Sequence, residues 1–201
     1  MKKITLGLLS LVAAAAFTAP VQAQLPNVTP FAFEVRGGLV FPTGDFADTE
    51  VDVAPPESGT TFGANVTFHF MPMLGIYAGY TQNRFGVEEL EQLEIVDQGF
   101  SGGLRFAVPT PLIPIDPYLK AGVVFNQLSY EFDDDDEVLD VEDSDRSLGF
   151  EIGAGIGIGL GPKLSITPQV TYTTYAPKYE GEADDYKVQH FRVDVGLRLR
   201  L

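Results

Sequence analysis

Apolar and polar residues alternate strictly over the last eleven positions of the chain. The apolar set is Phe191, Val193, Val195, Leu197, Leu199 and Leu201, and the set between them is Arg192, Asp194, Gly196, Arg198 and Arg200. A period of two predicts a β-strand with one apolar and one polar face. An unbroken apolar face opposite a densely charged one is typical of a strand that has lipid on one side and a polar lumen on the other.

The same alternation recurs earlier in the chain, and together the segments predict eight strands. They cover residues 31–41, 62–70, 74–81, 100–108, 119–126, 148–160, 164–172 and 191–201. Runs of this kind can supply the roughly 9–11 residues that a tilted strand needs to cross a bilayer. We therefore predict an all-β fold, an eight-stranded antiparallel up-and-down transmembrane β-barrel. An even number of strands places both termini on one side, which we expect to be the periplasm.

Two of these segments depart from a regular pattern. Pro168 lies on the apolar face of its segment and has no amide hydrogen to donate, so we expect a local irregularity there. Beyond Phe125 the apolar residues change face, as Leu128, Tyr130 and Phe132 show. Either a bulge or a hairpin that continues above the bilayer accounts for this change.

Charge is concentrated between the predicted strands. The net charge is −15, and 24 of the 28 acidic residues fall within 42–60, 86–98, 131–146 and 176–187. The short connections on the other side hold only Asp116. This distribution predicts long acidic loops outside the cell, and the overall acidity argues against nucleic acid as a partner. Outward-facing aromatic residues near both ends of the strands predict two aromatic girdles.

The first 23 residues have the features of a secretory signal peptide. Lys2 and Lys3 precede an apolar stretch from Ile4 to Phe17, and Ala23 ends a small-residue cleavage site. We expect residues 1–23 to be a cleavable signal peptide and residues 24–201 to form the barrel, with an uncleaved anchor as the alternative. The chain has no cysteine, so disulfides and thiolate metal sites are excluded.

Three glycine- and aromatic-containing runs, 74–80, 116–122 and 149–155, resemble the small OmpA/OmpX-like barrel family known as "outer membrane protein beta-barrel domain". The resemblance covers essentially all of residues 24–201. It implies location in the outer membrane, with lipopolysaccharide-containing lipid around the barrel. It also implies that the barrel-insertion machinery reads the C-terminal strand. No polar patch on the lipid-facing side indicates assembly, so we expect a monomer.

The predicted lumen receives a network of charged side chains. Its members are Glu34, Arg36, Arg105, Lys120, Glu151, Arg192, Asp194 and Arg198, with Arg200 at the end of the last strand. Closure of the barrel brings the first and last strands together, which predicts the pairs Glu34–Arg192 and Arg36–Asp194. Buried charges must be paired or hydrated. The network is therefore either an ion-pair plug that rigidifies the barrel or the lining of a narrow, weakly anion-preferring channel.

Other interpretations of the chain agree less well with its pattern. A soluble lipocalin-like barrel would need its bulky apolar face inside. The acidic run 133–145 can attract Ca²⁺ or Mg²⁺ but lacks an EF-hand loop, so solvated charge is the simpler interpretation. His69 and His190 fall at opposite ends of the predicted barrel, and neither belongs to a Ser/His/acid set. We expect a non-enzymatic protein without cofactor or metal, in a structural or surface role; the alternatives are a small passive channel and adhesion through the acidic loops.

Overall fold

The structure, a computed structural model, describes residues 31–47, 56–87, 93–110, 115–134, 137–177 and 187–201. The predicted signal peptide, residues 1–23, lies outside these ranges, as do parts of the predicted acidic loops. The elements are β1 (Phe31–Pro42), η1 (Gly44–Phe46), β2 (Gly59–Met71), β3 (Leu74–Gly86), β4 (Leu93–Ala107), β5 (Ile115–Asp134), β6 (Glu137–Asp143), β7 (Ser147–Gly159), β8 (Leu164–Tyr175) and β9 (Val188–Arg200). No helix in the described residues is long and apolar enough to span a membrane.

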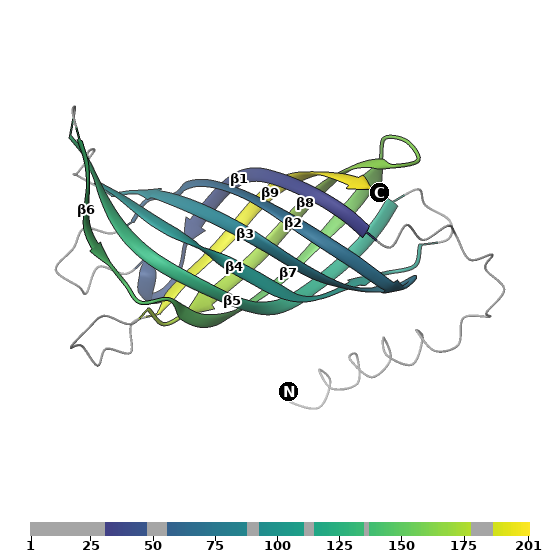
Figure 1. Ribbon diagram of the computed structural model, residues 1–201, viewed down its shortest axis with the longest axis horizontal. Coiled ribbons are helices and arrows are strands. Elements are labelled where there is room, and N and C mark those ends of the chain that lie inside the picture. Colours follow the sequence, from purple (N-terminus) through teal and green to yellow (C-terminus); the bar gives the residue numbers. More distant parts are fainter. Residues whose placement is uncertain (1–30, 48–55, 88–92, 111–114, 135–136, 178–186) are drawn as a thin grey trace, which may run out of the picture.

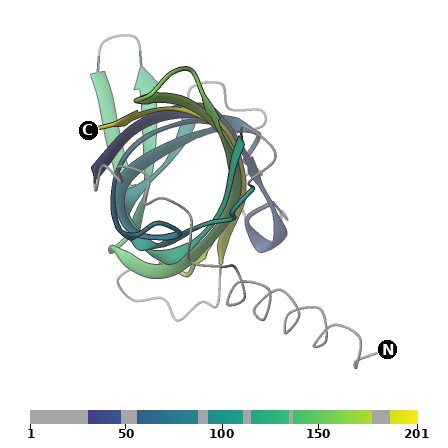
Figure 2. The same ribbon diagram turned by 90° about the vertical axis from the view of Figure 1, so that its right-hand side faces the viewer.

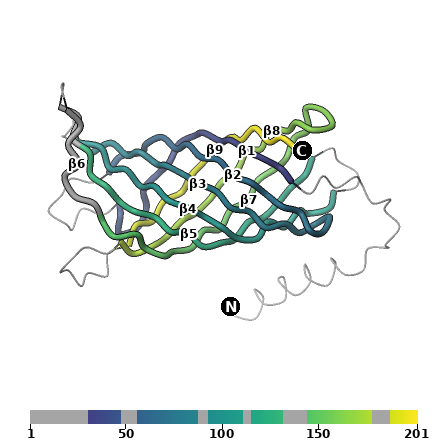
Figure 3. Tube along the Cα trace, in the orientation of Figure 1, coloured from purple at the N-terminus to yellow at the C-terminus, as the bar shows by residue number. Residues whose placement is uncertain are grey.

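Eight of the strands close into a barrel, which confirms the predicted fold class (Figures 1 and 2). Each strand pairs antiparallel with its neighbours, and β1 pairs with β9 from Ala32↔Arg200 to Pro42↔His190. β6 is not part of the ring, because it pairs with β5 alone. We call the end where β1 begins and β9 finishes the terminal end, and the opposite end, which carries β6, the loop end (Figure 3).

The apolar faces of the strands point outward and the polar faces point inward. On β9 the exposed fraction is 55% for Val195 and 47% for Leu197. Arg198, which lies between Leu197 and the outward-facing Leu199, is only 6% exposed. Aromatic residues of adjacent strands pair on the outer surface at both ends, such as Phe31 with Phe68 at 5.0 Å between ring centroids. A polar interior and an apolar exterior are the reverse of a soluble barrel, and they suit a barrel surrounded by hydrocarbon.

The strands extend further toward the loop end than predicted. β3 continues to Gly86 and β4 begins at Leu93, so Gly86 and residues 93–98 of the predicted loop 86–98 are strand. Asp97, which we assigned to that acidic loop, is a fully buried residue of β4. The error arose because the inward residues near the loop end are apolar as well as polar, which hides the alternation.

The change of face beyond Phe125 reflects an apolar barrel interior near the loop end and not a bulge against β4. β5 pairs with β4 without interruption from Ala107↔Tyr118 to Leu93↔Phe132. Its pairing with β7 ends at Asn126↔Ser147, and beyond that point β6 takes over as the second neighbour. The hairpin of the second explanation is present, but Leu128 is buried inside the barrel, so the apolar residues change face because the interior itself is apolar there.

The irregularity expected at Pro168 is also present. The β7–β8 ladder is regular from Gly149↔Tyr175 to Gly155↔Gln169 and resumes at Ile158↔Ile166. Ile156 and Gly157 have no partner on β8 between those points, although both pair with β5, and Pro168 keeps its place opposite Val195 of β9. Proline cannot donate a ladder hydrogen bond, which explains why the interruption lies there.

Candidate functional site in the barrel interior

β9 organises the polar interior, because its inward residues reach different groups of side chains along the barrel axis. In order from the loop end these residues are His190, Arg192, Asp194, Gly196, Arg198 and Arg200. Period two places them all on one face of the strand. The groups they contact come mostly from strands that are not neighbours of β9 in the ring, so the contacts cross the interior.

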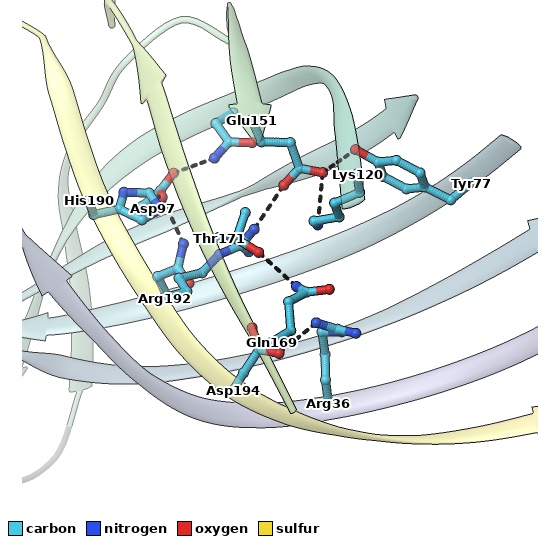
Figure 4. Close-up of polar contacts among 12 residues, drawn as sticks. Arg36, Tyr77, Asp97, Lys120, Glu151, Gln169, Thr171, His190, Arg192 and Asp194 are labelled. Carbon is cyan, nitrogen blue, oxygen red and sulfur yellow. Dashed lines mark hydrogen bonds and ion pairs between the residues drawn. The ribbon is translucent and has the colours of Figure 1, made fainter. Parts of the chain in front are cut away.

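The first group is centred on the carboxylate of Glu151 in β7, which is 3% exposed. Arg192 Nη2 donates to Glu151 Oε2 at 2.9 Å, and Lys120 Nζ donates to Oε1 at 3.1 Å. Tyr77 OH, from β3 on the far wall, also donates to Oε1 at 2.6 Å. Figure 4 shows these three side chains converging on Glu151. We call this the Glu151 cluster; two cations and one hydroxyl satisfy a carboxylate that would be costly to bury alone.

The second group, the Arg36 cluster, lies next toward the terminal end. Arg36 Nη1 donates to Asp194 Oδ1 at 2.5 Å, which is one of the two pairs predicted from the sequence (Figure 4). Arg36 also contacts Glu34 on its own strand. Arg105 Nη1 lies 3.5 Å from Glu34 Oε2, and the Arg105 guanidinium stacks over the ring of Tyr118, 3.4 Å from its centroid.

The other predicted pair, Glu34 with Arg192, is wrong. In the β1–β9 ladder Glu34 lies opposite Arg198 and Arg192 lies opposite Val40. Arg192 therefore sits nearer the loop end than Glu34 and binds Glu151 instead. Alternation alone shows which face a residue is on, but the pairing depends on the stagger of the strands, which the sequence pattern does not reveal.

All eight predicted lumen residues are buried in the interior, yet they are not equally partnered. Seven belong to the two clusters just described. Arg198 does not: its Nη2 lies 3.0 Å from His69 Nε2, and no carboxylate in the described residues comes within ion-pair distance of it. Arg200, at the end of β9, donates from Nη2 to Asp116 Oδ2 at 2.7 Å.

A third buried group near the loop end was missed by sequence reasoning. Asp97 accepts hydrogen bonds from Asn83 Nδ2, Asn126 Nδ2 and Tyr175 OH, each at 2.8 Å. His190 Nδ1 lies 3.7 Å from Asp97 Oδ2. We call these five residues the Asp97 cluster. The alternation of the predicted strands could have revealed this group. Asp97 and Asn83 each continue the inward-facing positions of a predicted strand beyond its predicted end.

An apolar cluster fills the interior beyond the Asp97 cluster, at the loop end. Its members are Val40, Phe46, Phe85, Val87, Leu93, Ile95, Val124, Leu128, Tyr175 and Val188, with Tyr130 packed against them. The short turn η1 brings Phe46 onto Phe85, with ring centroids 5.1 Å apart and the planes at 86°. The Phe85 ring also contacts the His190 ring, with ring centroids 5.9 Å apart, so the apolar cluster and the Asp97 cluster meet there.

The described interior offers no arrangement typical of a metal centre. Among the residues that the structure places, no three His, Asp or Glu side chains come together as ligands. The two histidines lie in different parts of the barrel, His69 with Arg198 and His190 with Asp97. The chemistry that this interior supports is recognition and neutralisation of charge by fixed ion pairs and hydrogen bonds.

Comparison with known proteins places the chain in a family. A family model described as "Outer membrane protein beta-barrel domain" matches residues 9–198, nearly the whole chain. The chain belongs to this family. This outer-membrane β-barrel domain protein therefore has the identity that the three glycine- and aromatic-containing runs indicated.

Curated relatives of this outer-membrane β-barrel domain protein include outer-membrane proteins of Brucella. The "25 kDa outer-membrane immunogenic protein" of Brucella melitensis is 32% identical over 126 residues, which are 60% of this chain and 54% of the relative. Its counterpart in Brucella abortus is 34% identical over 126 residues, with the same two shares. The chain thus spans about half the length of the curated relatives that it matches.

Among solved structures, the crystal structure of Neisserial surface protein A has a similar fold. The TM-score is 0.61 at 16% sequence identity, and the alignment covers 86% of this chain and 97% of the other. At this identity the likeness concerns the fold alone. It agrees with an eight-stranded outer-membrane barrel.

Proposed function

We propose that this outer-membrane β-barrel domain protein is a non-enzymatic structural and surface component of the outer membrane. The single observation that supports this role most is the bonding across its interior. Contacts join opposite walls at Tyr77–Glu151, Tyr175–Asp97 and Arg200–Asp116, and the apolar cluster fills the loop end. A lumen occupied by its own side chains favours a rigid plugged barrel over a water-filled pore.

The proposed orientation places the terminal end in the periplasm and the loop end outside the cell. The short connections β2–β3 and β7–β8 lie at the terminal end, while the β5–β6 hairpin projects from the loop end. Short periplasmic turns and longer outer loops are the rule for such barrels. The Brucella relatives are named immunogenic proteins, which supports exposure of the same end in this protein.

The proposed partners follow from this placement. The apolar outer face contacts outer-membrane lipid, and lipopolysaccharide head groups meet the acidic outer segments. The C-terminal strand β9 presents an unbroken apolar face from Phe191 to Leu199 for recognition by the barrel-insertion machinery. We propose that the protein acts as a monomer.

Conductance of the purified protein in planar lipid bilayers tests the structural role. We expect no stable current steps from the wild type, because ion pairs and the apolar cluster block the path. Simultaneous Phe46→Ala and Phe85→Ala substitutions remove the ring contact at the loop end and serve as a probe of that block. Stable steps in the wild type that shift on Arg36→Ala or Glu151→Ala would instead establish a passive conduit.

A further inference from the structure

The interior at the terminal end carries an excess of positive charge that the ion pairs do not neutralise. Three arginines gather there: Arg105 from β4, and Arg198 and Arg200 from β9. The carboxylates within ion-pair distance of this group are Glu34, which Arg36 shares, and Asp116, which binds Arg200. The group therefore contains more guanidinium charge than its own carboxylates balance.

Arg198 is the residue at which this imbalance is sharpest. It is 6% exposed, and its Nε makes no hydrogen bond within the described residues. Its guanidinium contacts an imidazole nitrogen of His69 rather than an acid. A buried arginine without an anionic partner is costly, because an ion loses its hydration on burial and regains it only through opposite charge.

The strands on either side of Arg198 do not supply the missing negative charge, because its ladder partners are Ser165 of β8 and Glu34 of β1. Glu34 lies opposite Arg198 in the ladder but turns toward Gly196, where its Cγ and Cδ lie 3.1 Å from the place that a Cβ of that glycine would occupy.

The solvent exposure of the three guanidiniums decreases from the rim of the barrel toward its interior. The Arg200 and Asp116 side chains are 39% and 60% exposed at the rim. His69 is half-buried, while Arg198 and Arg105 are buried further in. An anion that arrives at the terminal end meets Arg200 first and Arg198 after it.

We propose that Arg198, Arg105 and Arg200 form a binding site for a small oxyanion of the phosphate class at the terminal end of the barrel. Guanidinium groups bind phosphate oxygens through paired N–H donors, and several of them around one anion are a common mode of phosphate recognition. The bound anion supplies the charge that Arg198 lacks. Asp116 competes with it for Arg200. This site is independent of the proposed structural role, since a plugged barrel can hold an anion at one end.

Titration with inorganic phosphate tests the site. The full mature protein is refolded in a phosphate-free, uncharged detergent, and binding is followed by calorimetry at low ionic strength with chloride as the reference anion. We expect saturable binding of phosphate that chloride does not reproduce. Arg198→Gln weakens it at least tenfold, whereas Arg84→Gln, on β3 near the loop end, leaves it unchanged.

Two further variants keep the test decisive if Arg198→Gln does not fold. Asp116→Asn removes the competing carboxylate at the exposed rim, so we expect phosphate to bind severalfold more tightly. Arg198→Lys keeps the charge but loses the planar fork, and we expect intermediate affinity. Unchanged affinity in both variants, or phosphate binding no better than chloride in the wild type, overturns the proposal.

A second arm identifies the source of the phosphate group. The protein is placed in nanodiscs of phosphatidylglycerol or of uncharged lipid, without free phosphate, and the Nε signal of Arg198 is followed by NMR. A shift of that signal in phosphatidylglycerol alone assigns the site to a lipid head group. A shift only on addition of inorganic phosphate assigns it to a free anion. Absence of a shift in either case contradicts the proposal.

Discussion

At the scale of single residues, glycines on the inward faces make room for large side chains of neighbouring strands. Gly155 is the clearest case. A Cβ at this position would lie 2.4 Å from Tyr118 OH and 2.5 Å from its Cζ. The ring thus fills the space that the missing side chain leaves, and it holds Arg105 by stacking and Gln169 by a hydrogen bond of 3.0 Å.

We expect Gly155→Ala to destabilise the barrel by roughly 1–3 kcal/mol, the usual cost of overpacking a filled interior. Urea unfolding in lipid vesicles, followed by circular dichroism, measures it. Gly102→Ala is the matched control, since its Cβ would have no neighbour nearer than 3.5 Å. Adding Tyr118→Leu to Gly155→Ala should recover part of the loss; equal stability of Gly155→Ala and wild type would contradict the packing described.

A second prediction concerns the charge of Glu151. Glu151→Gln leaves Lys120 and Arg192 buried without a carboxylate, so we expect a loss of about 3 kcal/mol in the free energy of unfolding. Glu94→Gln provides the control, because the Arg84–Glu94 pair is roughly half exposed at 47% and 45% and such pairs contribute about 1 kcal/mol or less. A similar small effect of both substitutions would show that the Glu151 cluster is hydrated and weakly coupled.

At this scale the sequence predicted faces well and partners poorly. Alternation placed all eight lumen charges inside, and adjacency of the end strands was enough for Arg36 with Asp194. It failed for Arg192, whose partner comes from β7 and not from β1. Partners across a barrel depend on strand tilt and stagger, and these are properties of the closed ring rather than of any one segment.

At the scale of elements, the β5–β6 hairpin is separable from the barrel wall. Its base is fixed by Ser144, whose N–H donates to Leu128 O at 2.9 Å and whose Oγ accepts from Leu128 N at 2.9 Å. Beyond Tyr130↔Glu142 the hairpin has a register shift. The wall itself is complete without it, since β5 pairs with β7 up to Asn126.

We therefore expect the barrel to survive replacement of residues 131–141 by an Asn-Gly turn, which keeps Tyr130 opposite Glu142. β4 loses only two pairs with β5, Glu94↔Glu131 and Leu93↔Phe132. Retention of the fast-migrating unheated band in detergent gels checks this outcome. Deletion of Val123 within the wall is the contrast, since a one-residue slip turns every following side chain to the other face and should abolish that band.

Strand ends were the least predictable part of the elements. Alternation is clear where lipid faces polar side chains, as on β7 and β9. Near the loop end the inward residues Phe85, Ile95 and Leu128 are apolar, so both faces look alike in sequence. The predicted strands therefore stopped short, and the Asp97 cluster and the apolar cluster were not foreseen.

At the scale of the whole molecule, the barrel is a closed hydrogen-bonded ring with no free edge among the strands that form it. Closed rings of this kind resist detergent until heated. We expect the unheated protein to migrate faster in detergent gels than the boiled one. Identical migration before and after boiling would contradict closure through β1 and β9.

The interruption of the β7–β8 ladder at Pro168 is a weak point in the wall of the barrel. Ile156 and Gly157 lack partners on β8, although both remain paired with β5, opposite Pro117 and Asp116 near the terminal end. Deuterium should enter sooner at the one of these two amides that faces β8 than at amides of β9 at the same height. On heating, we expect unfolding to begin with the separation of β7 from β8 at this position.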